Sequence, residues 1–139
     1  MSKKTLFLTA VGLIFLMGAN AKAVDIILDS PQNGGTVGPG DTVELTLTVK
    51  NDQDTADLIL VSFCMMIDTG ERVITLGRGR PLRLKLEPGE TLTKTVAATI
   101  PADLPPLPIG PLDITIQAAA KGVKTGTEDS DSVFFTLDI

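Results

Sequence analysis

The side chains able to do chemistry in this chain are chiefly carboxylates, because it contains no histidine, no tryptophan and no tyrosine. Those absences remove the commonest general base and metal ligand, and the usual stacking platforms for sugars and bases. The carboxylates concentrate in two polar segments, which contain Asp52, Asp54 and Asp57 in the first and Glu128, Asp129 and Asp131 in the second. Because calcium takes roughly six to eight oxygen ligands, two such segments at one end of a domain would suit it.

The same residues have a simpler interpretation, since Asn and Asp are ordinary residues of turns and of solvated loops. We favour the turn interpretation and therefore expect no metal, no cofactor and no catalytic residue. A carboxylate pair for glycoside hydrolysis is the enzymatic alternative, but the aromatic side chains that would bind a sugar are missing. We therefore do not expect an enzyme.

Basic residues gather at one place, which contains Arg78, Arg80, Arg83 and Lys85, in a chain whose net charge is −5. A solvated strand face is the favoured interpretation, and binding to an acidic glycan or to an acidic neighbour is the alternative. The overall acidity excludes nucleic acid as an expected partner. Cys64 is the single cysteine, so no intramolecular disulfide can form. We expect a buried thiol, with an intermolecular disulfide as the alternative.

The elements that would position these groups are strands. From Val43 to Lys50 apolar and polar residues alternate, which is typical of a strand with one face in a core and one in water. Similar patterns, bounded by Gly, Pro, Asn and Asp, predict further strands. Their ranges are 24–28, 58–67, 72–76, 82–86, 91–100, 112–120 and 133–139, and 36–37 would resume the edge begun by the first of them. A proline-rich connection covers 101–111 and a polar loop covers 121–132.

The stretch 58–67 is apolar on both faces, so one face must be covered or offered to a partner. We predict a protein interface on one row of it, together with Phe134 of the last strand if both strands share a sheet. The residues of this predicted interface are Ile59, Val61, Phe63, Met65 and Phe134. The alternative is that a loop, such as the proline-rich one, folds across that face.

The first residues have the order of a secretory signal. Lys3 and Lys4 precede an apolar run that is too short for a spanning helix, and Ala21-Lys22-Ala23 supplies small residues for cleavage. We therefore predict a signal peptide over 1–23, one domain over 24–139, and export to the periplasm or outside the cell. An uncleaved anchor helix is the alternative.

About seven or eight short strands with no helix predict an all-β, immunoglobulin-like sandwich of two antiparallel sheets, with a closed barrel as the alternative. Two stretches carry a family resemblance: Pro39-Gly40-Asp41-Thr42-Val43, and Leu86-Glu87-Pro88-Gly89-Glu90-Thr91. They resemble the bacterial cell-adhesion-related immunoglobulin-like domains called CARDB. The resemblance implies an exported β-sandwich, usually one module of a larger surface protein, with no catalytic residues to carry over.

These observations together predict a non-catalytic exported module that makes protein contacts at the bacterial cell envelope or outside the cell. Two other functions are kept open. One is a self-assembling subunit of a surface fibre or layer, and the other is a calcium- or glycan-dependent binding module.

Overall fold

The computed structural model describes residues 23–138, and the regular structure in that range is entirely β-strand. The strands are β1 (Val24–Asp29), β2 (Thr36–Val37), β3 (Thr42–Asn51), β4 (Asp57–Asp68), β5 (Val73–Arg78), β6 (Leu82–Leu86), β7 (Thr91–Thr99), β8 (Leu112–Gly122) and β9 (Glu128–Leu137). Within this range no helix is long and apolar enough to cross a membrane. The predicted signal over 1–23 lies outside the described residues, apart from Ala23.

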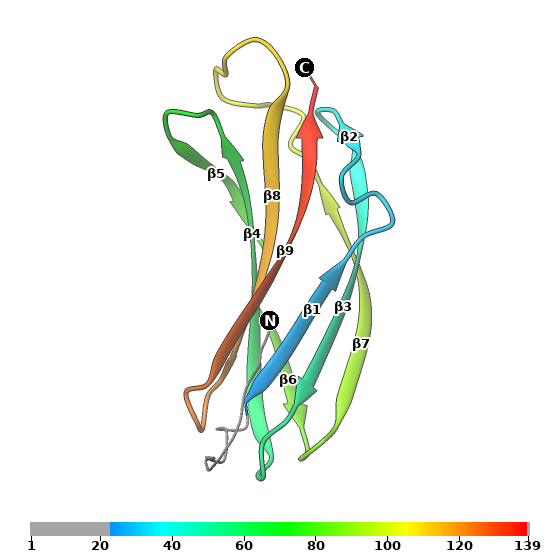
Figure 1. Cartoon of the computed structure of the whole chain (residues 1–139), viewed down its shortest axis with the longest axis vertical. Coiled ribbons are helices and arrows are strands. Elements are labelled where there is room, and N and C mark those ends of the chain that lie inside the picture. The colour runs from blue at the N-terminus through cyan, green and yellow to red at the C-terminus, as the bar shows by residue number, and fades with distance from the viewer. Residues whose placement is uncertain (1–22, 139) are drawn as a thin grey trace, which may run out of the picture.

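The strands form two sheets that face one another (Figure 1). The smaller sheet has the antiparallel order β1-β3-β7. The larger has the order β2-β9-β8-β4-β5, and β6 also pairs with β4. β5 and β6 share one edge of β4, because β6 pairs with its first half and β5 with its second. The predicted immunoglobulin-like sandwich of two sheets is therefore confirmed, and residues 23–138 do not form a closed barrel. The sheets are not antiparallel throughout as predicted, because the short strand β2 runs parallel to β9.

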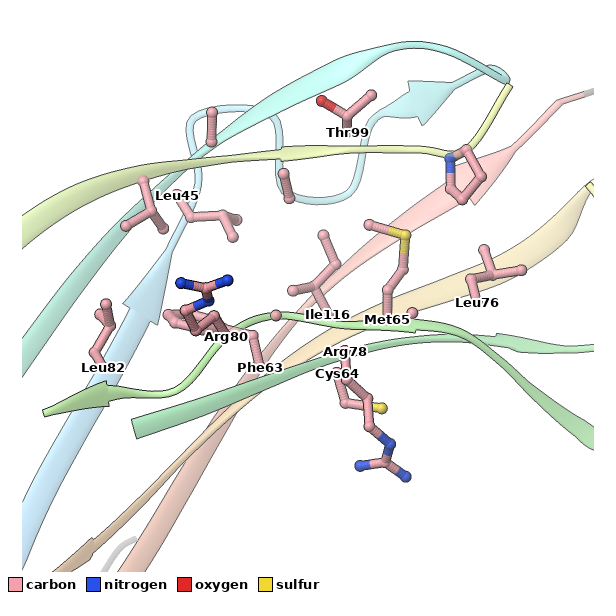
Figure 2. Close-up of a pocket in the computed structure, with 16 residues that line it drawn as sticks. Leu45, Phe63, Cys64, Met65, Leu76, Arg78, Arg80, Leu82, Thr99 and Ile116 are labelled. Atoms are coloured by element: carbon pink, nitrogen blue, oxygen red, sulfur yellow. The ribbon is translucent and has the colours of Figure 1, made fainter. Parts of the chain in front are cut away.

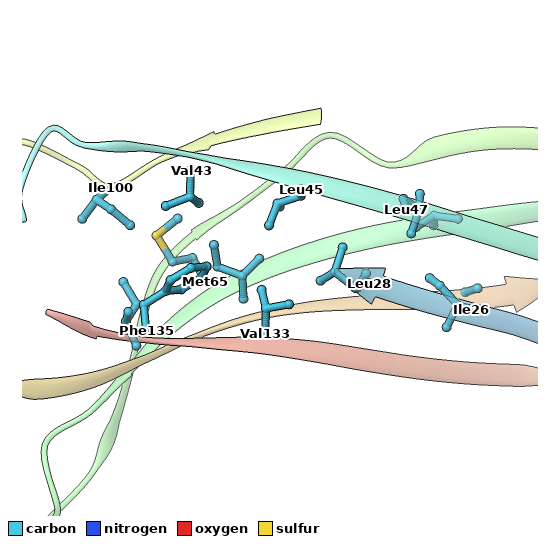
Figure 3. Close-up of a cluster of buried hydrophobic side chains, with 14 of the residues drawn as sticks. Ile26, Leu28, Val43, Leu45, Leu47, Met65, Ile100, Val133 and Phe135 are labelled. Carbon is cyan, nitrogen blue, oxygen red and sulfur yellow. The ribbon is translucent and has the colours of Figure 1, made fainter. Parts of the chain in front are cut away.

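The core lies between the sheets and is made by alternation along each strand. On β3 the inward residues Val43, Leu45, Leu47 and Val49 are all buried, while the residues between them face solvent or are half-buried. β4, β8 and β9 supply the opposing layer, including Met65, Val133 and Phe135 (Figure 3). Because successive side chains point to opposite faces of a strand, the two-residue pattern alone decides which of them meet.

The proline-rich connection between β7 and β8 extends the core. Its residues Leu104 and Leu107 pack against the buried cluster, whereas Ile109 is fully exposed. The connection between β6 and β7 is a four-residue turn, in which Gly89 has φ 76° and the Glu90 amide donates to the Glu87 carbonyl at 3.0 Å. A positive φ at the third residue of a four-residue turn is the feature that favours glycine there.

One prediction has the wrong bounds, because only residues 123–127 of the predicted loop 121–132 lie between strands. β8 continues to Gly122, and β9 begins at Glu128 rather than at Val133. The polar half of β9 lies beside β1, and two of its carboxylates accept hydrogen bonds from that strand. Asp129 Oδ2 accepts from the Ile26 amide at 3.0 Å, and Asp131 Oδ2 accepts from the Leu28 amide at 2.8 Å.

These two bonds close one side of the sandwich. An edge strand presents unpaired backbone groups that can recruit other strands. Here two backbone amides of the β1 edge donate to aspartate side chains of β9. These carboxylates take the place of the carbonyl groups that a neighbouring strand would supply. The sequence pattern did not reveal this strand contact, because aspartate is uncommon in strands and a stretch rich in it is typical of a loop.

Candidate functional site

The two acidic segments meet at the same end of the sandwich, as the calcium hypothesis requires. The Asp57 carboxylate of the first accepts hydrogen bonds from the Lys124 amide at 2.8 Å and from Thr125 Oγ1 at 3.1 Å, in the turn between β8 and β9. Thr127 Oγ1 in that turn donates to Gln53 Oε1 at 3.3 Å. The turn between β3 and β4 is therefore tied to the turn between β8 and β9.

Asp57 is 4% exposed, and its carboxylate is occupied by protein donors. Besides the two bonds from the β8–β9 turn, it accepts from the Leu58 amide at 2.8 Å and from Gln53 Nε2 at 3.3 Å. Desolvation by burial raises the pKa of this carboxyl, but the bonds from Lys124, Gln53, Thr125 and Leu58 favour its ionised form and together lower the pKa below 3.8. The group is a charged structural anchor.

Asn51 completes this buried network. Its Nδ2 donates to the Thr55 and Leu86 carbonyls, each at 3.0 Å, and its Oδ1 accepts from Gln53 Nε2 at 2.8 Å. A fully satisfied buried network holds its members in one arrangement, because any unpaired member would carry a desolvation cost. Three separate turns are thereby joined at one end of the fold.

Gly122 is required by the same network. A Cβ at this position would lie 2.5 Å from Asp57 Oδ2 and 2.9 Å from Thr125 Oγ1, which is closer than real Cβ contacts allow. The glycine here serves close packing, since it leaves room for the carboxylate.

The remaining calcium candidates do not join Asp57. Asp129 and Asp131 are engaged with β1, and Asp52 and Glu128 are exposed. Within residues 23–138 no group of three or more His, Cys, Asp or Glu side chains is placed to hold a metal ion. This geometry does not support the calcium alternative for Asp52, Asp54, Asp57, Glu128, Asp129 and Asp131.

The predicted interface row on β4 requires a correction. Ile59, Val61 and Met65 point into the core, and the first two are 0% exposed, so Ile59 and Val61 cannot contact a partner. Phe63 is also on the inward side and packs against the core, although it is only partly buried. The register explains the wrong choice of row: both rows are apolar, and pairing with β8 turns the Ile59 row toward the small sheet.

The outward row of β4 consists of Leu58, Leu60, Ser62, Cys64 and Met66, and its apolar members are partly exposed. Phe134 shares this face, as predicted, because β9, β8 and β4 are neighbours in one sheet. Its ring is 57% exposed, and the register aligns Phe134 with Thr115 of β8 and then with Met66. Cys64 is therefore a partly exposed free thiol on the outer face and not a core residue.

Basic side chains border this outward row. Leu60 lies between Arg83 of β6 and Lys121 of β8 in the register, and Leu58 lies beside Lys85. Arg78 is opposite Cys64 on β5. We call this surface the outer face; it comprises the outward residues of β4 with Phe134, Arg78, Arg83, Lys85 and Lys121. It combines apolar area with positive charge in a chain that is acidic overall.

A groove lies on the side of the sandwich opposite the β1–β9 contact. It has a volume of about 360 Å³ and opens between β7 of the small sheet and the β5–β6 edge of the large one. Leu45, Val96 and Ala98 line it from the small sheet, and Phe63 and Met65 line it from the large sheet. In Figure 2 the Arg80 side chain extends into the space between the sheets, while Arg78 points away from it. The sequence predicted these two arginines as parts of one basic cluster. It gave no signal of the groove, whose lining residues come from both sheets.

No protein-family model matches the chain, and no curated protein matches it. Solved structures with a similar fold exist at low sequence identity. The sporulation control protein Spo0M from Bacillus subtilis has a TM-score of 0.62 and 17% identity over 84% of this chain and 50% of its own. A CARDB domain from Pyrococcus furiosus, solved in complex with di-metal ions, has a TM-score of 0.56 and 15% identity over 93% of this chain and 99% of its own.

A β-glucosidase from Erythrobacter marinus has a TM-score of 0.59 and 18% identity, but the match covers 84% of this chain and only 15% of the enzyme. This chain thus spans half the length of Spo0M and a small part of the glucosidase. Identities in this range establish the fold alone, because one sandwich fold carries many functions. The chain has a CARDB-like immunoglobulin-type fold.

Proposed function

We propose that this protein is a non-catalytic binding module, exported to the bacterial cell envelope or beyond, and that its outer face contacts another protein. The observation that carries the proposal is the combination on that face of a partly exposed apolar row, an exposed Phe134 and four basic side chains. Interface centres are typically rich in aromatic residues, Met and Arg.

The apolar part of the outer face supplies the driving force. Covering about 100 Å² of apolar surface contributes roughly 2.5 kcal/mol, so a contact over Leu60, Met66 and Phe134 offsets part of the cost of association. Phe134 is the natural anchor, because it is an aromatic side chain on this face and is 57% exposed.

The basic part of the outer face selects the partner. Arg78, Arg83, Lys85 and Lys121 lie beside Leu58, Leu60 and Cys64 of the outward row, in a chain of net charge −5. Complementary charge steers association and fixes the register of an interface. The partner we propose is therefore a different protein with carboxylates around an apolar patch.

Export is supported by the order of charged, apolar and small residues over 1–23. N-terminal sequencing of protein recovered from the envelope and the medium tests it, with Val24 as the expected first residue. Recovery of the unprocessed chain from the cytoplasm alone would contradict this part of the proposal.

The contact is tested by affinity capture from envelope and secreted fractions with three proteins: wild type, Phe134→Ser and Ile27→Ser. Ile27 is a matched control, because it is 52% exposed but lies on the small sheet. We expect a partner that is held by wild type and Ile27→Ser, lost by Phe134→Ser and released by salt. A partner retained equally by all three proteins, or no partner at all, would refute the outer face as the interface.

Light scattering at high protein concentration distinguishes self-assembly. We expect a monomer. If the protein instead forms concentration-dependent oligomers that are absent in Phe134→Ser, the partner of the outer face is a second copy of this chain.

A further inference from the structure

The groove between β7 and the β5–β6 edge is a second surface, separate from the outer face. We propose that it binds an extended peptide segment, which adds as a strand to the free edge of β7, inserts an apolar side chain into the groove and presents a carboxylate to Arg80 and Lys94. This proposal does not depend on the outer face.

The backbone of β7 provides the first reason. β7 pairs with β3 along one side, and no strand of the described range pairs along its other side. Strand addition to such an edge gains main-chain hydrogen bonds, while pockets for alternate side chains give specificity. On the opposite side of the sandwich the β1 edge is less free for strand addition, because Asp129 and Asp131 accept hydrogen bonds from its Ile26 and Leu28 amides.

β7 is a better edge than β5–β6. β7 runs for nine residues without interruption, whereas β5 and β6 are separated by Gly79, Arg80 and Pro81. Proline has no backbone N–H and cannot donate to an added strand. The β5–β6 edge therefore forms the opposite wall of the groove.

The space for a side chain exists because small residues line that wall. Gly77 is on the inward side of β5, in register with Met65, and a Cβ built there would meet no atom within 4 Å. Gly79 lies against Phe63, and a Cβ at this position would be 3.4 Å from the Phe63 Cβ. A large side chain at either position would occupy the groove. Its volume of about 360 Å³ is at the lower end for ligand sites and suits one apolar side chain with its backbone.

The charges at the groove select the peptide. Lys94 occupies an inward position of β7 but is exposed, two residues from Val96 in the groove lining. Arg80 extends into the same space from the other sheet (Figure 2). An added strand would place alternate side chains along this row, so leucine and glutamate two positions apart fit an apolar groove with basic residues beside it.

A second copy of this chain is not the expected occupant. A symmetric contact through this edge would bring Arg80 and Lys94 of both copies together, and inward-pointing charge on an edge strand opposes such pairing. The positive charge beside the free edge of β7 therefore opposes pairing with a second copy of this chain and favours an acidic peptide segment.

The probe is a fluorescein-labelled peptide about eight residues long in which threonine alternates with leucine and glutamate, followed by fluorescence anisotropy up to about 1 mM protein. We expect it to bind at least about tenfold more tightly than a peptide with lysine for glutamate, or one with serine for leucine. Backbone amides of β7 should gain protection from hydrogen exchange on binding, while those of β1 should not.

Two variants locate the site. Gly77→Leu fills the groove and should weaken peptide binding by about tenfold or more, with an unchanged circular dichroism spectrum. Arg80→Glu should reverse the preference between the acidic and basic peptides. Arg78→Glu is the matched control, because it makes the same charge change on a side chain that points away from the groove (Figure 2).

The proposal is overturned if no peptide binds, if Gly77→Leu leaves the affinity unchanged, or if Arg78→Glu and Arg80→Glu act alike. Octanoate is a further arm of the test, since it has an apolar tail and an anion but no peptide backbone. Octanoate binding that Gly77→Leu abolishes, without any peptide binding, would assign the groove to a small amphiphile and also refute the proposal. None of these outcomes alters the capture experiment on Phe134, so the two proposals fail separately.

Discussion

Replacing Asp57 tests whether the acidic end of the sandwich is a structural anchor. In Asp57→Asn the best amide orientation keeps a carbonyl oxygen toward the Leu58 and Lys124 amides, each 2.8 Å from Oδ1 in the wild type. The bond from Gln53 Nε2 to Oδ2 is then lost, the Thr125 hydroxyl must reorient, and the remaining bonds lose their charge assistance. A hydrogen bond to a charged group contributes roughly 1.5–3 kcal/mol, so we expect a loss of about 2–3 kcal/mol.

Asp57→Ala removes the acceptor for all four donors and should cost more, about 3–5 kcal/mol, because buried donors are left unsatisfied. For a domain of this size roughly 3–5 °C of melting temperature corresponds to each kcal/mol, so Asp57→Asn should melt about 6–15 °C below wild type. Circular dichroism is the suitable probe, since the chain has no tryptophan or tyrosine. Asp103→Asn, at an exposed site in the proline-rich connection, is the matched control and should change stability by less than about 0.5 kcal/mol.

The pH dependence gives a second readout on Asp57. Because its folded-state pKa lies below the unfolded value near 3.8, the ionised carboxylate stabilises the fold above that pH. This contribution is lost as the pH falls through the lower folded-state pKa, where the carboxyl protonates in both states. The stability difference between wild type and Asp57→Asn should therefore be largest at neutral pH and shrink below about pH 4. A difference that is absent at neutral pH, or unchanged in acid, would refute the anchor role.

Three other substitutions test the arrangement of the fold. Gly122→Ala should destabilise the protein by about 1–3 kcal/mol in urea unfolding, because the new Cβ would collide with the Asp57 carboxylate. Gly77→Ala is the control and should be nearly neutral, because its Cβ would have open space around it. Equal losses of stability in the two variants would contradict this packing. Ile59→Ala should cost about 2–5 kcal/mol in the same assay and Leu60→Ala less than half of that, and the reverse order would mean that the two rows of β4 are exchanged. Asp131→Ala should speed hydrogen exchange of the β1 amide that it accepts from, seen by NMR, and unchanged exchange would show that this edge is protected by other means.

The sequence predicted most strands to within a few residues. From Val43 to Lys50 one face is apolar and the other polar, so burial of β3 follows from its own residues. The turn at Gly89 was predictable for the same reason, because its proline and glycine act on the local backbone. The alternating pattern of β8 and β9 likewise favours Ile114, Ile116 and Phe135 as core residues, and all three are buried.

The errors arose where the pattern was symmetric or misleading. Both rows of β4 are apolar, so the choice between Ile59 and Leu60 as the inward residue needed a partner strand. The polar start of β9 resembles a loop, and its place in the sheet becomes understandable only beside β1, whose amides Asp129 and Asp131 bind. The basic residues predicted as one cluster lie on two surfaces: Arg78, Arg83 and Lys85 are on the outer face, whereas Arg80 lines the groove. Arg80 differs because it lies in the break between β5 and β6.

By itself, then, the sequence determined the all-β class, the two-layer sandwich and the identity of the inward residues on β1, β3, β8 and the C-terminal half of β9, because alternation is a local property of a strand. Tertiary structure decided the rest: which face of β4 is buried, that the Asp57 carboxylate is filled by protein donors, and that Gly77 leaves a groove beside a free edge. Each of these depends on contacts between residues that are distant in the chain, and no local pattern encodes which strand will lie beside which.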